Sequence, residues 1–179
     1  AIIKKNILSW KFLPAIWEIV MESLLHRRIF KRNLMLGYMH ASIAFGWFLL
    51  IVVGFFEAEF GIHGSKPFWV AIFYRFFQHD HNTFASAAVF TQVMDGLLLF
   101  VLSGIAIAFV TMIYSRILGM RKVTKHVIFD RFAKVSLWCI FPFRLLSESV
   151  TAAMYHNGGF LTQTIGDILP FANVYVEYT

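Results

Sequence analysis

LMLGYMHASIAFGWFLLIVVGFF, residues 34–56, is a stretch of 23 residues without a formal charge. At about 1.5 Å rise per residue, a helix of this length crosses a hydrocarbon core of roughly 30 Å. A basic segment, HRRIFKRN (residues 26–33), precedes it, and one imidazole, His40, lies near its start. The stretch predicts a membrane-spanning helix that begins on the cytoplasmic side, because basic residues gather there.

The composition of the whole chain agrees with lipid as the surrounding solvent. Of its 179 residues, 59% are hydrophobic and only 15% are charged, whereas about a quarter are charged in an average soluble domain. Too few polar residues remain to cover a water-soluble surface. The formal net charge of +6 comes from basic residues at the ends of apolar stretches, which favours membrane orientation over nucleic-acid binding.

We expect an all-α fold, a single membrane domain over residues 1–179 with three spanning helices at 34–56, 84–114 and 130–155. The segments between them alternate in charge as membrane crossings require. Residues 57–83 contain few basic residues and should lie outside, whereas residues 115–126 are basic and should lie in the cytoplasm. Residues 156–179 contain no Lys or Arg and read as an external loop.

Residues 1–33 have the pattern of an amphipathic helix lying in the membrane interface. Apolar residues recur at helical spacing and basic residues lie between them, which is typical of a helix in the headgroup plane. This basic N-terminal segment should be cytoplasmic. The chain starts with Ala and three crossings leave its last residues outside, so we expect a chain truncated at both ends.

His40 is the strongest candidate for a functional residue. An ionisable group inside a spanning helix often marks a functional site, and an axial ligand of haem b is one common role. A histidine hydrogen-bonded to a neighbouring helix is the alternative. His126, at the cytoplasmic end of the third span, is the internal candidate for a second ligand on that side, although the charges around it favour a surface position. We expect the second ligand to come from a helix after residue 179 rather than from His126.

His26 lies 14 residues before His40, which on a continuous helix places the two imidazoles about 21 Å apart on nearly the same face. Four cations lie between them, at positions 27, 28, 31 and 32. Since such a block cannot line the middle of a membrane, we expect His26 at the interface.

Three charged residues fall inside the second and third spans. Asp95 is an isolated acid in an apolar helix, and Arg144 and Glu148 have the i,i+4 spacing of an ion pair. By their depth all three belong to the middle or outer part of the membrane, so one cluster is geometrically possible. It could line a quinone or proton path, or be a structural ion pair.

Small residues in the spans leave two interpretations open. Gly37, Gly46 and Gly54 permit close packing either by a neighbouring helix or by a flat cofactor. The single cysteine, Cys139, excludes an internal disulfide or iron–sulfur site. We expect Cys139 to be a small buried hydrophobic residue.

The stretches LLHRRIFKRN, NLMLGYMH, FPFRLLSESVTA and HNGGFLTQTIGD together resemble the membrane cytochrome b family of respiratory nitrate reductase gamma subunits. They resemble still more closely the fused relatives in heterodisulfide-reductase-like iron–sulfur proteins. The resemblance implies a helical bundle in a bacterial or archaeal cytoplasmic (inner) membrane. It also implies haem b, a quinone as substrate and an iron–sulfur partner on the cytoplasmic side. His40 matches the family's haem ligand on the first ligand-bearing helix.

The sequence also departs from the family's pattern. The family carries a second histidine about ten residues along the same helix, where this chain has Leu50. A later motif similar to PFSRxxH supplies further ligands, but FPFRLLSE has Glu148 near the expected histidine. The cysteine-rich clusters of the fused relatives are absent from this sequence, so any iron–sulfur cluster would belong to a partner or another domain.

We therefore expect a membrane electron-transfer subunit that binds haem b and links a quinone pool to a cytoplasmic iron–sulfur oxidoreductase. It would be part of an oxidoreductase and not catalytic alone. A haem-free membrane anchor or quinone-docking module of such an enzyme is the alternative. A transporter fragment is a third class with little support, since no internal repeat or pair of broken helices is evident.

Overall fold

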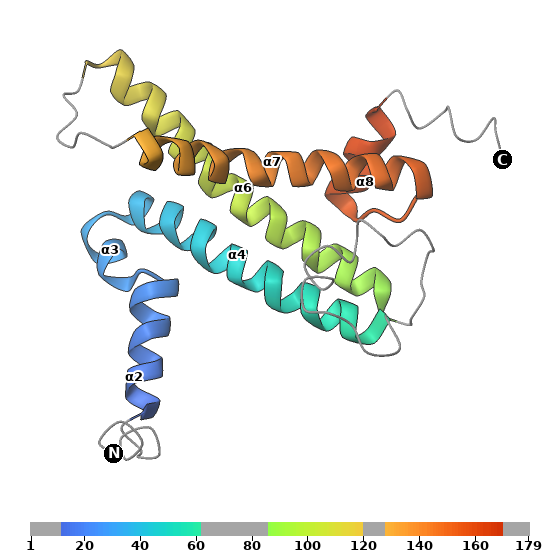
Figure 1. Ribbon diagram of the computed structural model, residues 1–179, viewed down its shortest axis with the longest axis horizontal. Coiled ribbons are helices and arrows are strands. Elements are labelled where there is room, and N and C mark those ends of the chain that lie inside the picture. The colour runs from blue at the N-terminus through green and yellow to red at the C-terminus, as the bar shows by residue number, and fades with distance from the viewer. Residues whose placement is uncertain (1–11, 62–85, 120–127, 170–179) are drawn as a thin grey trace.

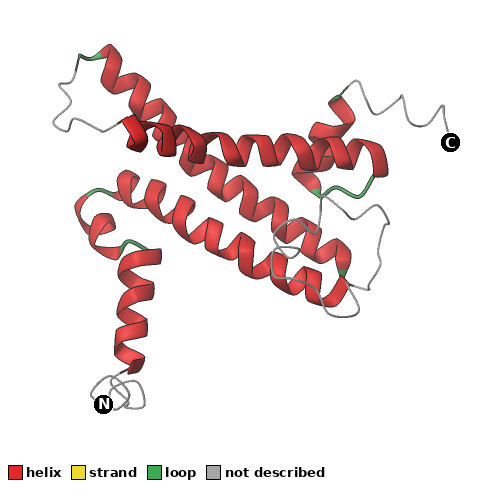
Figure 2. Cartoon of the chain, viewed as in Figure 1, coloured by secondary structure: helices red, strands yellow, loops and turns green. Residues whose placement is uncertain are grey.

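The computed structural model describes residues 12–61, 86–119 and 128–169. Within these ranges every regular element is helical, as Figure 2 shows. The order is α2 (Phe12–Ile19), the π-helical turn η1 (Val20–Leu24), α3 (Arg27–Arg32), α4 (Leu34–Gly61), α6 (Ala87–Ile117), α7 (Ile128–Tyr155) and α8 (Phe160–Ile168). The predicted all-α class is confirmed for this part of the chain.

The long helices α4 and α6 form the centre of the molecule and run side by side in opposite directions (Figure 1). Both are long and apolar enough to cross a membrane, and among the described residues they are the two that meet this test. α4 contains the first predicted span, 34–56, and continues to Gly61, whereas α6 contains the second, 84–114, from Ala87 onward; residues 84 and 85 lie outside the described residues.

Small residues let α4 and α6 approach closely. A Cβ atom added at Gly104 would overlap the Ser42 hydroxyl and lie 3.2 Å from the Met39 carbonyl oxygen, and one added at Gly46 would lie 2.5 Å from Val101 Cγ2. The Tyr38 and Ser103 hydroxyls join the two helices by a 2.7 Å hydrogen bond. At Gly46, therefore, a neighbouring helix and not a flat cofactor takes the space.

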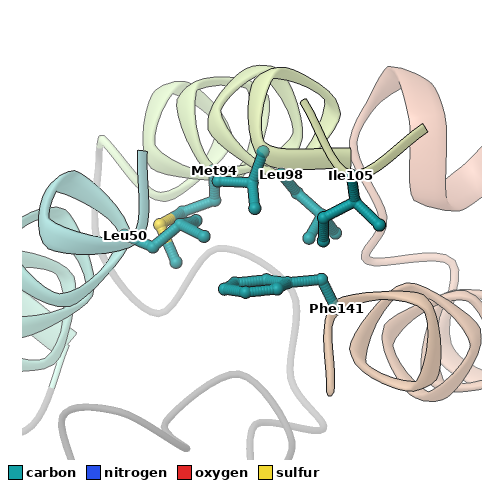
Figure 3. Packing of buried hydrophobic residues seen from close by; sticks show 6 residues of the cluster. Leu50, Met94, Leu98, Ile105 and Phe141 are labelled. Atoms are coloured by element: carbon teal, nitrogen blue, oxygen red, sulfur yellow. The ribbon is translucent and has the colours of Figure 1, made fainter. Parts of the chain in front are cut away.

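α7 is one helix and coincides with the third predicted span, 130–155, apart from two additional residues at its start. It crosses α6 in Figure 1 and inserts Phe141, which is 1% exposed, into the main apolar cluster. Figure 3 shows this ring pointing toward Leu50 of α4 and toward the side chains of α6. The cluster consists of Leu50, Met94, Leu98, Val101, Ile105 and Phe141.

Two sequence predictions about the ends of the chain are wrong. Residues 156–179 do not form a loop throughout, because residues 160–168 form α8, which folds back against α7. Residues 1–33 do not form one helix. In their described part the helix ends after η1, and His26 takes the left-handed conformation (φ 51°, ψ 39°) before α3 begins.

Beside the apolar cluster, the described residues include buried polar side chains and many exposed large apolar ones. Asp95, Glu148, Ser149 and Thr162 are buried, whereas many large apolar side chains are exposed. On α7 the exposed ones include Phe129, Phe132, Val135, Ile140, Phe143 and Leu146. Cys139 is exposed as well, so the prediction of a buried cysteine is wrong. An apolar medium around the helices accounts for this arrangement, because there the polar groups need protein partners and the apolar groups do not.

Gly104→Val should weaken the contact between α4 and α6. The added side chain meets Ser42 and the α4 backbone, and overpacking of this kind costs about 1–3 kcal/mol. Thermal unfolding in detergent, followed by circular dichroism, measures the loss. Gly96→Val is the matched control on the same helix, since a Cβ atom there meets nothing within 4 Å. Equal loss of stability in both variants would show that close packing at Gly104 is not the cause.

Candidate functional site

The buried carboxylate of Asp95 binds the first turn of α8. One oxygen, Oδ2, accepts hydrogen bonds from the backbone N–H groups of Leu161 (2.8 Å) and Thr162 (3.0 Å). The Thr162 hydroxyl donates to the same carboxylate at 3.1 Å. Asp95 is fully buried. α6, a separate helix, therefore supplies the acidic capping residue that the N-terminus of α8 favours.

Neighbouring residues complete this cap. Gln92 Oε1 accepts a hydrogen bond from the Phe160 N–H (3.2 Å), and the Gly159 N–H donates to the Thr162 hydroxyl (2.9 Å). A Cβ atom at Gly159 would overlap the Asp95 carboxylate, so only glycine allows this approach. The first amides of α8, which have no partner within their own helix, are thus bonded to side chains.

Arg144 and Glu148 form the ion pair that their spacing predicts. Arg144 Nε donates to Glu148 Oε1 at 2.9 Å, and the two side chains are 14% and 6% exposed. Asp95 does not join them, since its hydrogen bonds all go to α8. The single cluster of Asp95, Arg144 and Glu148 expected from helix depth is therefore not formed. Depth fixes the position of a residue along the membrane normal but not the direction in which its side chain points.

A chain reversal brings His26 next to His40. Their rings stack with centroids 5.6 Å apart and planes inclined by 19°. The left-handed backbone of His26 costs about 1–2 kcal/mol in a residue with a side chain, and it turns the chain from η1 into α3. The 21 Å separation expected for one continuous helix does not apply, because the helix is broken at this residue.

The short helix α3 is held antiparallel against the start of α4. Asn33 is extended and its Oδ1 accepts a hydrogen bond from the Leu36 N–H (3.0 Å), which caps α4. Phe30 covers Gly37 so closely that an added Cβ would lie 2.6 Å from the Phe30 ring. Gly37 is therefore covered by protein, and α3 runs back along α4 until His26 is level with His40.

Among the described residues, His26 and His40 are not placed as a pair of axial haem ligands. Two axial imidazoles approach iron from opposite faces of the macrocycle, but the stacked rings of His26 and His40 leave no room for one between them. His40 is exposed and can serve as a single ligand. His156 directly follows the last residue of α7, and its Nδ1 lies 3.4 Å from Nε2 of Gln163. His126 lies outside the described residues, as do His63, His79 and His81.

A metal centre made only of protein ligands is not evident in the described segments. No group of three or more His, Cys, Asp or Glu side chains comes together there. The pair of His26 and His40 is the only place in these segments where two histidine rings stack.

Sequence reasoning missed Thr162, Gly159 and Gln92, which complete the partners of Asp95. The run NGGFLTQT (residues 157–164) contained a usable signal. Glycine followed three residues later by threonine, ahead of apolar residues at helical spacing, is typical of a helix start. The lack of basic residues in this segment favoured a loop instead.

No family model matches the chain, and the comparisons with curated proteins and with solved structures found no match.

Asp95→Ala should release the first turn of α8. Hydrogen bonds to a charged group contribute about 1.5–3 kcal/mol each, so a loss of about 3 kcal/mol or more is expected. Hydrogen exchange of the amides in residues 160–168 should become about 100-fold faster, while exchange in α4 stays unchanged. Asp167→Ala is the control, because Asp167 is an exposed acid of the same helix. Unchanged exchange in Asp95→Ala would contradict the cap.

Proposed function

We propose that the chain is a membrane electron-transfer subunit that links a quinone pool to an iron–sulfur oxidoreductase on the cytoplasmic side. In this proposal haem b is bound with His40 as one axial ligand. The observation that carries it is an exposed imidazole on a long apolar helix, His40 on α4. The resemblance to the membrane cytochrome b family stays a prediction beside it.

The proposed topology has three crossings, α4, α6 and α7, with the N-terminal arm in the cytoplasmic interface. α7 has more charged residues than the other two, but Arg144 and Glu148 are turned inward and paired. Among the residues of α7 whose side chains the structure describes, the large exposed ones are apolar. This arrangement supports a helix in contact with lipid, where charges face the protein interior.

The position of α3 indicates where the hydrocarbon core begins. Arg27 and Arg28 directly follow His26, which stacks on His40. If the hydrocarbon core began at Asn33, His40 would lie about 10 Å inside it. Because the cations of α3 need headgroups or water, we place His40 at the cytoplasmic boundary of the core instead. The uncharged part of α4 that follows His40, residues 41–56, is then about 24 Å long, and Glu57 and Glu59 follow it at the outer end of the helix.

His40 would hold the haem iron from this boundary, within reach of a cytoplasmic partner. Haem b would supply one-electron transfer between the quinone and that partner. The second ligand has to come from a residue other than His26, whose ring stacks on His40. His126, two residues before α7 begins, is proposed for this role.

Arg144 and Glu148 are the proposed contacts for a quinone or for the proton that accompanies its reduction. They are a charge pair in the outer half of α7, with little exposure. Asp95, proposed with them from the sequence, is engaged by four hydrogen bonds to α8. We therefore assign Asp95 a structural part in shaping this region.

A haem-free anchor and quinone-docking module is the second candidate. One observation favours it. In the described ranges His40 is the single exposed imidazole on an apolar helix. The nearest histidine, His26, stacks on it and so does not provide a second ligand on the far side of an iron. Such a module would keep Arg144 and Glu148 as its polar contacts and would carry no redox group of its own.

A reduced-minus-oxidised absorption spectrum of the detergent-purified chain separates the two candidates. We expect a b-type band in the wild type that is lost in His40→Ala. His126→Ala should lose it too if His126 is the second ligand. The control is His156→Asn, which changes an exposed histidine at the other end of α7 and tolerates the left-handed backbone there (φ 50°). A band that survives in His40→Ala would contradict the assignment, and the absence of any band would favour the haem-free anchor.

A further inference from the structure

α2 presents an apolar surface that no other described part of the chain covers. None of its residues is buried, and its large apolar side chains are 40–65% exposed. They share one side of the helix, over an arc of about 160°, while Glu18 lies on the opposite side. The set is Phe12, Leu13, Ile16, Trp17 and Ile19. In Figure 1, α2 leads away from the start of α4.

α3 presents a basic surface beside this apolar one. Arg27, Arg28, Lys31 and Arg32 are all exposed and occupy an arc of about 140°. The rest of the helix circumference carries Ile29 and Phe30, and Phe30 packs on Gly37 of α4. The helix contains no acidic residue, so its outward side is uniformly positive.

Contacts on both sides of the break fix the relation between these two surfaces. Arg28 lies 3.3 Å from Glu22 of η1 and 3.9 Å from Glu18 of α2. Phe30 and the stacked His26 hold α3 on α4. α4 is a candidate membrane helix. The basic side of α3 therefore lies at the level where the hydrocarbon-spanning part of α4 would begin.

We propose that α2 and α3 together form a binding site for anionic phospholipid. The side chains of α2 enter the acyl-chain boundary, and Arg27, Lys31 and Arg32 bind lipid phosphate groups. The inference rests on the proposed membrane placement of α4 and not on the haem. Apolar aromatic residues next to a uniformly positive helix match a lipid surface, which offers an apolar layer beneath a layer of phosphates. An acidic protein would match only the cations and would leave the apolar side of α2 uncovered.

The test measures thermal unfolding of the full chain in dodecyl maltoside with added phosphatidylglycerol. Phosphatidylcholine and inorganic phosphate at the same concentration are the comparison arms. Binding to the folded state should raise Tm by about 3–6 °C with phosphatidylglycerol alone. The increase should be lost in the triple variant Arg27→Gln/Lys31→Gln/Arg32→Gln. It should persist in the matched triple variant Arg116→Gln/Arg121→Gln/Lys122→Gln, whose cations belong to the other basic segment of the predicted cytoplasmic side.

Other results would overturn the lipid site. An equal increase with phosphatidylcholine or phosphate, or an increase that survives in the α3 triple variant, would show that α3 does not select anionic lipid. Loss of binding to an acidic protein in that variant, with the lipid effect intact, would make α3 a protein-docking surface instead. If the variant fails to fold, the wild type in 0.5 M salt decides, because screening must abolish the increase.

The membrane placement itself is checked separately. If alkaline carbonate without detergent extracts the protein from membranes, the placement is wrong. If the protein needs detergent and phosphatidylglycerol has no effect, only the lipid site is wrong.

Discussion

The close contact between α4 and α6 at Gly104 and Gly46 is the constraint on which the rest of the fold depends. It brings two helix backbones together without large side chains between them, which is how helices associate when their surroundings are as apolar as they are. α3, α7 and α8 attach to this pair. Phe141 of α7 packs against both helices, Asp95 of α6 caps α8, and Gly37 of α4 accepts α3. Phe141 spans both helices, so a larger side chain at the contact would disturb its packing.

Buried polar groups then decide how the remaining helices are arranged. Asp95 cannot be left alone in an apolar region, and α8 satisfies it with two backbone amides and a hydroxyl. Arg144 and Glu148 satisfy one another. At the opposite end of α4, the cations of α3 stay exposed and mark the boundary where an aqueous phase is needed. The buried polar groups thus lie in the middle of the molecule, and the exposed cations of α3 lie at the start of α4. His40 lies between these two regions.

The positions of α4 and α6 could be predicted because a long apolar run is a property of the sequence itself. Residues 34–56, 84–114 and 130–155 all lie in helices or begin within a few residues of one. The partners of Asp95 and the stacking of His26 on His40 could not be predicted in this way. Both depend on chain reversals, at Gly158–Gly159 and at Leu25–His26, whose backbone angles bring residues distant in sequence together. A hydropathy pattern does not contain that information.

The proposed topology places α7 in lipid although polar residues lie on its inner side. Cys139, the only cysteine in the sequence, tests it most directly, because its side chain is exposed on α7 and not covered by the rest of the described chain. In intact membranes a membrane-impermeant maleimide should fail to label Cys139 from either side, whereas a lipid-soluble maleimide should react. Labelling should become fast once the protein is unfolded in detergent. Rapid reaction of the folded, membrane-bound protein with the impermeant reagent would place α7 in water and contradict the account.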